Sequence, residues 1–492
     1  MPKYKTPIQP AHNSKQPSQD ALEQVLMNLT PWDVVTARSA CEGILITGSP
    51  GSGKSSTAFK KIALAFLNSG YGGLVLSSKR EEPELWMEYA WLAGRQNDII
   101  RLSPEGDECF DPLFHVFNMP GRGAGDVESV ISGINTLLAI GHPNSGGGSS
   151  DRFWELETER TMRATIKAMH IAREPISIVS MNDFIQSLPT EKDQHKTEEW
   201  QSNSYCADVL AKIRMRNEAG GFSPDEADDV EMVMWFVCKK WPGLHERERG
   251  IVAATWYGMA DRFLYQPYKR LFSSGVCTFV PEMATHEGKI ILVDFPVLET
   301  GQETSRFVNC MMKIFFQQAW LRRNFAKVPR VAFLAADEAQ NFVLPKGRDN
   351  FFSQSCRSAG IVVLMATQNL SQIAEEFGEY QIGAKTKAWL GNLALKIAFQ
   401  QNDVDTNTYY ADLIGKEYRM LRSMSLREDA EISQSEHLAY KVEPDVWAGL
   451  RKPDGDNPIA EAIVHFGGKR FEATRCEDYP NGLNYVRAHF MR

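Results

Sequence analysis

The stretch ITGSPGSGKSS, residues 46–56, decides the fold class of this chain. It fits the pattern G-x-x-x-x-G-K-[ST], with Gly48, Gly53, Lys54 and Ser55 at the defined positions. A short apolar run comes directly before the stretch, and a helical pattern begins at its end. The order is therefore strand, glycine-rich turn, helix, which is the context that a Walker A loop requires.

The chemistry of phosphate binding explains these residue types. Glycines let the backbone turn so that successive N–H groups point inward as an anion nest, and the helix N-terminus adds partial positive charge. Lys54 is expected to reach the β- and γ-phosphates, and the Ser55 hydroxyl to ligate Mg²⁺. A chance glycine-rich turn is the alternative, which the match of both pattern and context disfavours. The predicted nucleotide-binding residues are Gly48, Gly51, Ser52, Gly53, Lys54, Ser55 and Ser56.

Short aliphatic runs recur along the chain and predict a sheet. They occupy residues 43–47, 72–78, 289–295, 330–336, 361–367 and 393–399. Continuous apolar runs are typical of strands that are buried on both faces, as in a parallel sheet covered by helices. Helical patterns separate most of the runs. We predict an α/β fold, a RecA-like P-loop NTPase core with a largely parallel sheet.

One long stretch interrupts the alternation of strands and helices. Between about residue 112 and residue 280 there is no convincing strand, but several stripes of apolar residues recur at helical spacing. We predict an all-α inserted domain between the second and third strands. The first residues are rich in Pro, Gln and Lys, which is typical of a disordered tail. The predicted division is a tail at 1–30, a RecA-like domain at 31–111 and 281–492, and a helical insertion at 112–280.

Composition limits the classes of protein that remain. The 492 residues carry a net charge of −8, so any nucleic-acid contact must depend on a local basic patch. Eight scattered cysteines without a C-x-x-C pair favour reduced thiols in the cytoplasm. No apolar run reaches the roughly 18 residues that span a bilayer. We therefore expect a cytoplasmic chain with no transmembrane segment of its own.

A second acidic motif follows a later apolar run. RVAFLAADEAQNF, residues 330–342, places Asp337 and Glu338 at the end of a predicted strand, as in a Walker B motif. In a parallel sheet this edge lies beside the phosphate loop. Asp337 can then hold Mg²⁺, and Glu338 can polarise the attacking water as a general base. The alternative is an acidic pair that only caps the next helix.

The segment SQSCRSAGIVVLMATQN, residues 353–369, supplies two further candidates. If its apolar run is the strand next to the Asp337 strand, Gln368 emerges at the nucleotide edge, where it can sense the γ-phosphate or orient water. Arg357 lies on the preceding helix and could act in trans on a neighbour's nucleotide, as an arginine finger. A last-turn cation favoured by the helix dipole is an equal alternative for Arg357. For Gln368 the alternative is a polar strand end.

Other nucleotide-dependent classes fit less well. The letters DEAQ suggest a helicase, but Lys54 and Asp337 are 283 positions apart, and only 124 residues follow Gln368. That leaves little room for a second RecA-like lobe. The chain has no N-K-x-D guanine motif, which disfavours a GTPase. An ATP motor is the remaining interpretation.

The ordered set of motifs resembles the type IV coupling proteins of bacterial conjugation and secretion, the TraD/TraG-type ATPases of the FtsK/HerA class. The resemblance extends from about residue 30 to residue 475. The segments that carry it are GSPGSGKSS (48–56), CFDPLFHVFN (109–118), RFWELETERTMRATI (152–166), DEAQNF (337–342), SCRSAGIVVLMATQNLSQIAEEFG (355–378) and LALKIAFQQNDVDTNTYYADLIG (393–415).

The resemblance implies a hexameric, ATP-driven DNA translocase that recruits DNA or a nucleoprotein and feeds it into a secretion channel. The implied cofactors are ATP and Mg²⁺, and the implied partners are DNA, a homohexameric ring of the chain itself, and type IV secretion or relaxosome proteins. Catalytic roles fall on Glu338, Gln368 and Arg357, and metal binding on Ser55 and Asp337. Two alternatives remain open: an FtsK/HerA-type packaging or recombination translocase, and an ATP-dependent protein-cargo adaptor without DNA movement, which the negative charge favours.

The chain departs from the family pattern at three places. The transmembrane helices with which the family usually begins are absent from this sequence, so attachment to the inner membrane would be peripheral, through a partner. SSKREEP, residues 77–83, replaces the usual Asp-Pro-Lys-Gly after the second strand. Asp111 replaces the family's Asn before Pro-Leu.

Overall fold

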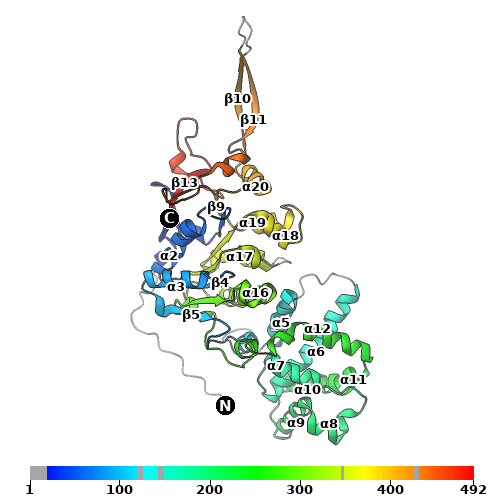
Figure 1. The fold of residues 1–492 in the computed structure, drawn as a ribbon. Helices are drawn as coiled ribbons and strands as arrows, with labels where there is room; N and C mark the ends of the chain where they lie inside the picture. Colours follow the sequence, from blue (N-terminus) through cyan, green and yellow to red (C-terminus); the bar gives the residue numbers. More distant parts are fainter. Residues whose placement is uncertain (1–18, 120–125, 142–148, 345–347, 425–431) are drawn as a thin grey trace.

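The structure is a computed structural model of the chain. It describes residues 19–119, 126–141, 149–344, 348–424 and 432–492. Within these residues the chain forms an α/β body, a helical region beside it, and a two-stranded hairpin that projects from the opposite end of the body (Figure 1).

A nine-stranded sheet forms the centre of the α/β body. Its strands are β3 (Ile44–Thr47), β4 (Gly72–Ser77), β5 (Ile99–Leu102), β6 (Ile290–Asp294), β7 (Ala332–Ala336), β8 (Ile361–Thr367), β9 (Leu395–Phe399), β12 (Ile459–Phe466) and β13 (Tyr485–Met491). Their order across the sheet is β13-β12-β9-β3-β8-β7-β4-β6-β5. From β9 to β5 all neighbours pair in parallel, whereas β12 and β13 pair antiparallel at one side.

All six predicted strands are present, and their apolar runs are buried on both faces. Every residue of β3, β4, β6, β7, β8 and β9 is buried. Alternate side chains enter two different cores: Leu45 and Leu74 lie in one, and Ile44 and Val75 in the other. The predicted α/β fold with a largely parallel sheet is confirmed.

Three strands of the sheet were not predicted. β5 and β13 are the two outermost strands, and β12 lies next to β13. β13 alternates between buried and exposed residues, and β5 carries the exposed Arg101, because an outer strand is covered less completely than a central one. Such short or polar strands lack the continuous apolar run by which the central strands are identified.

Helices cover both faces of the sheet. One face carries α2 (Lys60–Asn68) and α3 (Glu82–Leu92). The other carries α16 (Gln302–Arg322), α17 (Arg348–Ala359), α18 (Leu370–Glu376), α19 (Ala384–Gly391) and α20 (Val404–Ile414). α16 is buried on nearly every side, because it lies between the sheet and the helical region. The two sides together give the layered arrangement of an α/β domain.

The segment between β5 and β6 is helical. Its helices are α4 (Pro112–Asn118), α5 (Val127–Gly141), α6 (Ser149–Ala172), α7 (Ile178–Gln186), α8 (Glu198–Asn203), α9 (Tyr205–Glu218), α10 (Pro224–Trp235), α11 (Trp241–Gly243), α12 (Glu246–Ala260), α13 (Tyr268–Phe272) and α14 (Glu282–His286). A further short helix, α15 (Val297–Thr300), follows β6. The described residues between these two strands contain no extended strand. The domain boundaries at 111–112 and 280–281 stay predictions.

The two ends of the helical region meet at a buried junction. Phe110 forms an antiparallel bridge with Cys277 and stacks on Phe279, with ring centroids 5.7 Å apart. The Asp111 carboxylate caps α4 by accepting the N–H groups of Leu113 and Phe114, and its second oxygen accepts the N–H of Gly275 at 3.0 Å. Burial raises the pKa of Asp111 to about 7. One side chain thus joins the entry and the exit of the helical region.

The N-terminal segment corrects one prediction. Residues 19–28 form a 3-10 turn (Gln19–Leu22) and strand β1 (Val25–Asn28), which pairs with β2 (Val34–Thr36) before helix α1 (Ala37–Ala40). The predicted disordered tail is therefore wrong for residues 19–30, and residues 1–18 lie outside the described residues. The Asp33 carboxylate accepts the N–H groups of Glu472 and Ala473, so contacts with the C-terminal part of the chain, distant in sequence, hold this segment.

The projecting hairpin consists of β10 (Lys416–Met424) and β11 (Ile432–Tyr440), which pair antiparallel only with each other (Figure 1). Among the described residues, none of the helices combines the length and apolar character that a bilayer crossing needs.

The junction at Asp111 generates a stability prediction. Asp111→Ala removes the cap of α4 and leaves the partly buried Gly275 N–H without its acceptor, so it should destabilise the chain by about 2 kcal/mol. Asp111→Asn keeps one carbonyl oxygen for the cap and should lose roughly half as much. Thermal unfolding of the two variants beside wild type measures the difference, and an alanine variant as stable as wild type would contradict the assigned role.

Candidate nucleotide site

The glycine-rich loop lies between the end of β3 and the helix that continues into α2. Gly51 and Gly53 have φ values of +74° and +92°, which side-chain-bearing residues rarely adopt. A Cβ at Gly48 would lie 2.4 Å from Ser52 Oγ, and one at Gly53 would lie 2.9 Å from Ala460 Cβ. The loop therefore requires glycine for its backbone conformation and for its close packing.

The loop is prepared to accept polar groups from a ligand. The Ser52 hydroxyl is buried and has no hydrogen-bond partner among the described residues. Lys54 is 7% exposed, so its ammonium is held close to the sheet edge. Ser55 begins the helix, and Ser56 follows it within the first turn. The structure thus places the predicted nucleotide-binding residues in one continuous loop and helix start.

The second acidic motif meets this loop across the sheet edge. Ser55 Oγ donates a hydrogen bond of 2.7 Å to Asp337 Oδ2, although the two residues are 282 positions apart. Asp337 and Glu338 follow β7 directly and are 8% and 4% exposed. Glu338 has a φ of +59°, a left-handed conformation that is uncommon for a residue with a side chain. The predicted adjacency of the two motifs is present in the structure.

A lysine that the sequence did not indicate also belongs to this site. Lys79 follows β4, and its Nζ lies 2.5 Å from Glu338 Oε1 and 3.4 Å from Asp337 Oδ2. Lys54 Nζ lies 3.9 Å from the same Glu338 oxygen. Burial alone would raise the pKa of Glu338, but hydrogen bonds from Lys79 and Gln340 and the two lysine charges bring it below its ordinary value. Glu338 is therefore held as a carboxylate.

The signal that could have identified Lys79 is its place in the chain. It stands just after an apolar run, as Asp337 and Gln368 do, and parallel strands end at one edge of the sheet. The segment SSKREEP lacks the Asp of the family pattern, and Lys79 within it has no motif of its own that marks a nucleotide site. Gln340 was missed for a different reason, because its amide reaches Glu338 Oε2 at 2.8 Å only through the turn that follows the strand.

Gln368 lies where its position after the apolar run predicts. β8 pairs in parallel with both β7 and β3, so the residue after β8 emerges between the two nucleotide motifs. Gln368 Nε2 lies 3.4 Å from each oxygen of the Glu338 carboxylate. The preceding Thr367 donates to Gln340 Oε1 at 2.9 Å. These amides form a polar layer around the Glu338 carboxylate.

Arg357 is not at this site. It lies near the end of α17, before β8 begins, and its guanidinium is 3.4 Å from Glu42 just before β3. The seven residues of β8 span about 23 Å, so Arg357 and Gln368 lie at opposite edges of the sheet. The Arg357 side chain is 66% exposed. The arginine cannot reach the nucleotide loop of its own chain.

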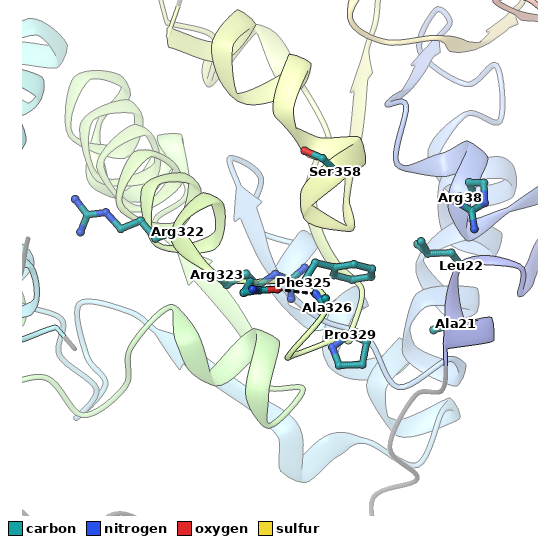
Figure 2. A pocket seen from close by; sticks show the side chains of 10 residues that line it. Ala21, Leu22, Arg38, Arg322, Arg323, Phe325, Ala326, Pro329 and Ser358 are labelled. Carbon is teal, nitrogen blue, oxygen red and sulfur yellow. Dashed lines mark hydrogen bonds between the residues drawn. The ribbon is translucent and has the colours of Figure 1, made fainter. Parts of the chain in front are cut away.

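A cavity of about 920 Å³ lies at this opposite edge (Figure 2). Side chains from the end of α16, the end of α17 and the N-terminal segment surround it, among them Arg323, Phe325, Ser358 and Leu22. The Arg323 guanidinium donates hydrogen bonds to main-chain carbonyls, including those of Ala359 and Arg330, and so holds the chain around the start of β8. The cavity is remote from Glu338 and is not the nucleotide site.

Residues from the C-terminal part of the chain contact the glycine-rich loop. Gln400, after β9, accepts the N–H of Ser49 at 2.8 Å through its carbonyl oxygen. Lys452 Nζ lies 3.4 Å from the carbonyl oxygen of Pro50. Gln401 donates to Thr47 Oγ1 at 3.3 Å. These contacts hold the loop from the side of β9 and β12. No motif in the sequence predicts them.

The assembled groups fit a nucleoside triphosphate with Mg²⁺. An anion nest with a free hydroxyl and an ammonium suits phosphate oxygens, and the Ser55 hydroxyl beside the Asp337 carboxylate supplies the oxygen ligands that Mg²⁺ prefers. Glu338, with Gln368 and Gln340 around it, is placed to accept a proton from a water molecule. The arrangement can bind a triphosphate and prepare it for hydrolysis.

Comparisons with known proteins agree with this geometry. Residues 331–445 match a family model described as the TraM recognition site of TraD and TraG. No curated protein matches the chain. Several solved structures do, at low identity.

The bacterial conjugative coupling protein TrwBdeltaN70, in its unbound monoclinic form, has a TM-score of 0.55 and 13% identity over 91% of this chain and 88% of that chain. TrwB in complex with the non-hydrolysable ATP analogue ADPNP has a TM-score of 0.54 and 14% identity, over 89% and 85% of the two chains. TrwB in complex with ADP and Mg²⁺ has a TM-score of 0.52 and 13% identity over the same shares. At this identity the likeness shows a shared fold.

The glycine geometry generates a binding prediction. Gly53→Ala places a methyl group against Ala460 and forces a side-chain-bearing residue to a φ of +92°, which costs about 1–2 kcal/mol and should weaken nucleotide binding about tenfold or more. Gly94→Ala is the matched control, because Gly94 also has a positive φ, +67°, but stands in open space beyond α3. Fluorescence titration with a labelled nucleotide measures binding. Equal affinity in the two variants would argue against the role given to Gly53.

Proposed function

We propose that this chain is an ATPase that works as a conjugative coupling protein. The match of residues 331–445 to the family model of TraD and TraG supports the proposal, as does the fold shared with TrwB. The observation that carries the proposal is the contact between Ser55 and Asp337, which joins the phosphate loop to the second acidic motif beside Glu338. Bound ATP with Mg²⁺ supplies a phosphoanhydride whose cleavage releases free energy.

Each residue of the site has its own role in the proposed hydrolysis of ATP. Lys54 and the N–H groups of the loop bind the phosphates and offset their charge. Ser55 and Asp337 would hold the metal. Glu338 would accept the proton of the attacking water, and Gln368 would orient that water or sense the γ-phosphate. The depressed pKa of Glu338 keeps it ionised and ready to accept the proton.

The active unit that we propose is a homohexameric ring. Arg357 lies at the sheet edge opposite its own nucleotide site, is 66% exposed, and contacts Glu42 at 3.4 Å. In a ring, the edge that carries Arg357 can face the nucleotide edge of the next copy. Arg357 would then stabilise charge on the neighbour's transferring phosphate as an arginine finger.

The substrate that we propose is DNA or a nucleoprotein, recruited and pumped toward a secretion channel. The TraM recognition site named in the family description supports relaxosome or type IV secretion proteins as partners. The place of action is the cytoplasm, with peripheral attachment to the inner membrane through a partner. An FtsK/HerA-type packaging or recombination translocase would use the same machinery with a different partner.

A second candidate function is an ATP-dependent adaptor for protein cargo that does not move DNA. The net charge of −8 favours it, because a DNA motor needs a local basic surface to offset that charge. The helical region and the projecting hairpin offer surfaces for such cargo.

DNA stimulation separates the motor from the adaptor. For a motor, the rate of ATP hydrolysis should rise when DNA is added. With about six phosphate contacts, the DNA affinity should fall about a thousandfold between 50 and 200 mM salt. Steady-state ATPase assays across DNA and salt concentrations measure both effects. Lys54→Ala should abolish hydrolysis with or without DNA, and a wild-type rate that does not respond to DNA would favour the adaptor.

Mixing inactive variants tests the ring. Arg357→Ala and Glu338→Gln should each lower ATP hydrolysis by about a thousandfold, because each removes a group needed at the transferring phosphate. In a mixture, a site that takes its arginine from one variant and its glutamate from the other is complete, so part of the activity should return. Arg38→Ala is the matched control, since Arg38 is exposed and pairs with Glu23 near the same sheet edge. Without recovery in the mixture, action in trans fails.

A further inference from the structure

Lys79 occupies a position that the functions assigned above do not use. Its ammonium lies between the two buried carboxylates of the nucleotide site, 2.5 Å from Glu338 Oε1 and 3.4 Å from Asp337 Oδ2. Both are carboxylates to which nucleotide hydrolysis assigns a role, one in holding the metal and the other in accepting a proton. The side chain therefore contacts both acidic groups of the motif at once.

The main chain of Lys79 is held by hydrogen bonds, while its side chain is partly exposed. The buried Glu82 carboxylate accepts the N–H groups of Ser78 and Lys79 at 2.9 and 3.4 Å, and Ser77 Oγ donates to the Lys79 carbonyl oxygen at 3.1 Å. The Lys79 side chain is 40% exposed, in contrast to 8% for that of Lys54. Because the main chain of Lys79 is held and its aliphatic side chain has several rotatable bonds, the ammonium can leave the carboxylates without a change in fold.

The charges at the site show why a second cation is needed. Asp337 and Glu338 are neighbouring buried acidic residues. Burial and the Asp337 charge raise the pKa of the nearby buried Glu82, which favours its neutral form and leaves Asp337 and Glu338 as the charges to be offset. Lys54 contacts Glu338 at 3.9 Å, and no cation other than Lys79 is recorded in contact with Asp337 among the described residues. A buried carboxylate without a cation is strongly destabilised.

We propose that Lys79 is a positioning residue that stands in for the divalent cation: its ammonium neutralises Asp337 and Glu338 in the nucleotide-free chain, and Mg²⁺ must displace it. The proposal rests on the proposed function of the site. While Lys79 is in place, the contact from Ser55 to Asp337 and the position of Glu338 persist without metal. Lys79 would have to release both carboxylates before they could hold Mg²⁺, so it raises the Mg²⁺ concentration that the site requires.

The first measurement is Mg²⁺-dependent binding of a labelled, non-hydrolysable ATP analogue. Lys79→Met removes the charge and keeps the apolar stem, so the half-saturating Mg²⁺ concentration should fall about three- to tenfold. Lys79→Arg keeps a cation and should stay within about twofold of wild type. Arg80→Met is the matched control, because Arg80 is the adjacent cation but is 77% exposed and pairs with Glu299. Its half-saturation should not change.

The second measurement uses Mn²⁺ alone, without nucleotide, and follows free Mn²⁺ by electron paramagnetic resonance. Lys79→Met should bind Mn²⁺ more tightly than wild type by a similar factor, and Asp337→Asn added to Lys79→Met should remove that gain. An unchanged or weaker Mn²⁺ affinity in Lys79→Met overturns the proposal. If wild type fails to bind the ATP analogue, the proposed function fails, whereas the Mn²⁺ comparison still decides the role of Lys79. A cooperative thermal transition shows that Lys79→Met is folded, and its melting temperature should lie below that of wild type because the buried carboxylates have lost a cation.

Discussion

The parallel pairing of four neighbouring strands is the constraint on which the rest of the structure depends. β3, β8, β7 and β4 are hydrogen-bonded in that order and run in one direction, so the residues that follow them meet at one edge of the sheet. That edge gathers the phosphate loop, Gln368, Asp337 with Glu338, and Lys79. The hydrogen bond from Ser55 to Asp337 joins the phosphate loop to the acidic motif. Because the strands are fully buried, the positions of these polar groups are fixed by the core.

The direction of the strands also places residues that are close in sequence far apart in space. Arg357 and Gln368 are eleven positions apart, yet the length of β8 puts them at opposite edges of the sheet. Because about 23 Å of strand separates them, Arg357 and Gln368 cannot both reach one site within one chain. The contact of Arg357 with Glu42, just before β3, shows that the opposite edge has its own charge pairing. If both residues act on one nucleotide, as proposed above, they come from two copies of the chain.

The helical region is joined to the sheet by packing as well as by sequence. One hydrophobic core includes Leu45 and Leu74 of the sheet, Phe315 of α16, and Ile131 and Trp256 of the helical region. A Cβ at Gly133 in α5 would lie 3.4 Å from the Phe315 ring, so α5 and α16 approach closely. Asp111 holds the two ends of the region together through main-chain N–H groups. Movement of the helical region relative to the sheet would have to disturb this shared core.

The sequence by itself determined the six central strands, the glycine-rich loop and the acidic motif, because continuous apolar runs and the G-x-x-x-x-G-K-[ST] spacing are local signals. It also determined that Gln368 follows a strand. Only the tertiary structure decided that β8 lies between β3 and β7, that β5, β12 and β13 complete the sheet, and that residues 19–28 are ordered against the rest of the chain. The contact of Lys79 with Glu338 is also visible only in the tertiary structure, as is the position of Arg357 at the sheet edge opposite the nucleotide site. The physical reason is that an apolar run indicates a buried strand but not the strands that pair with it. Strand pairing depends on packing between segments that lie hundreds of residues apart.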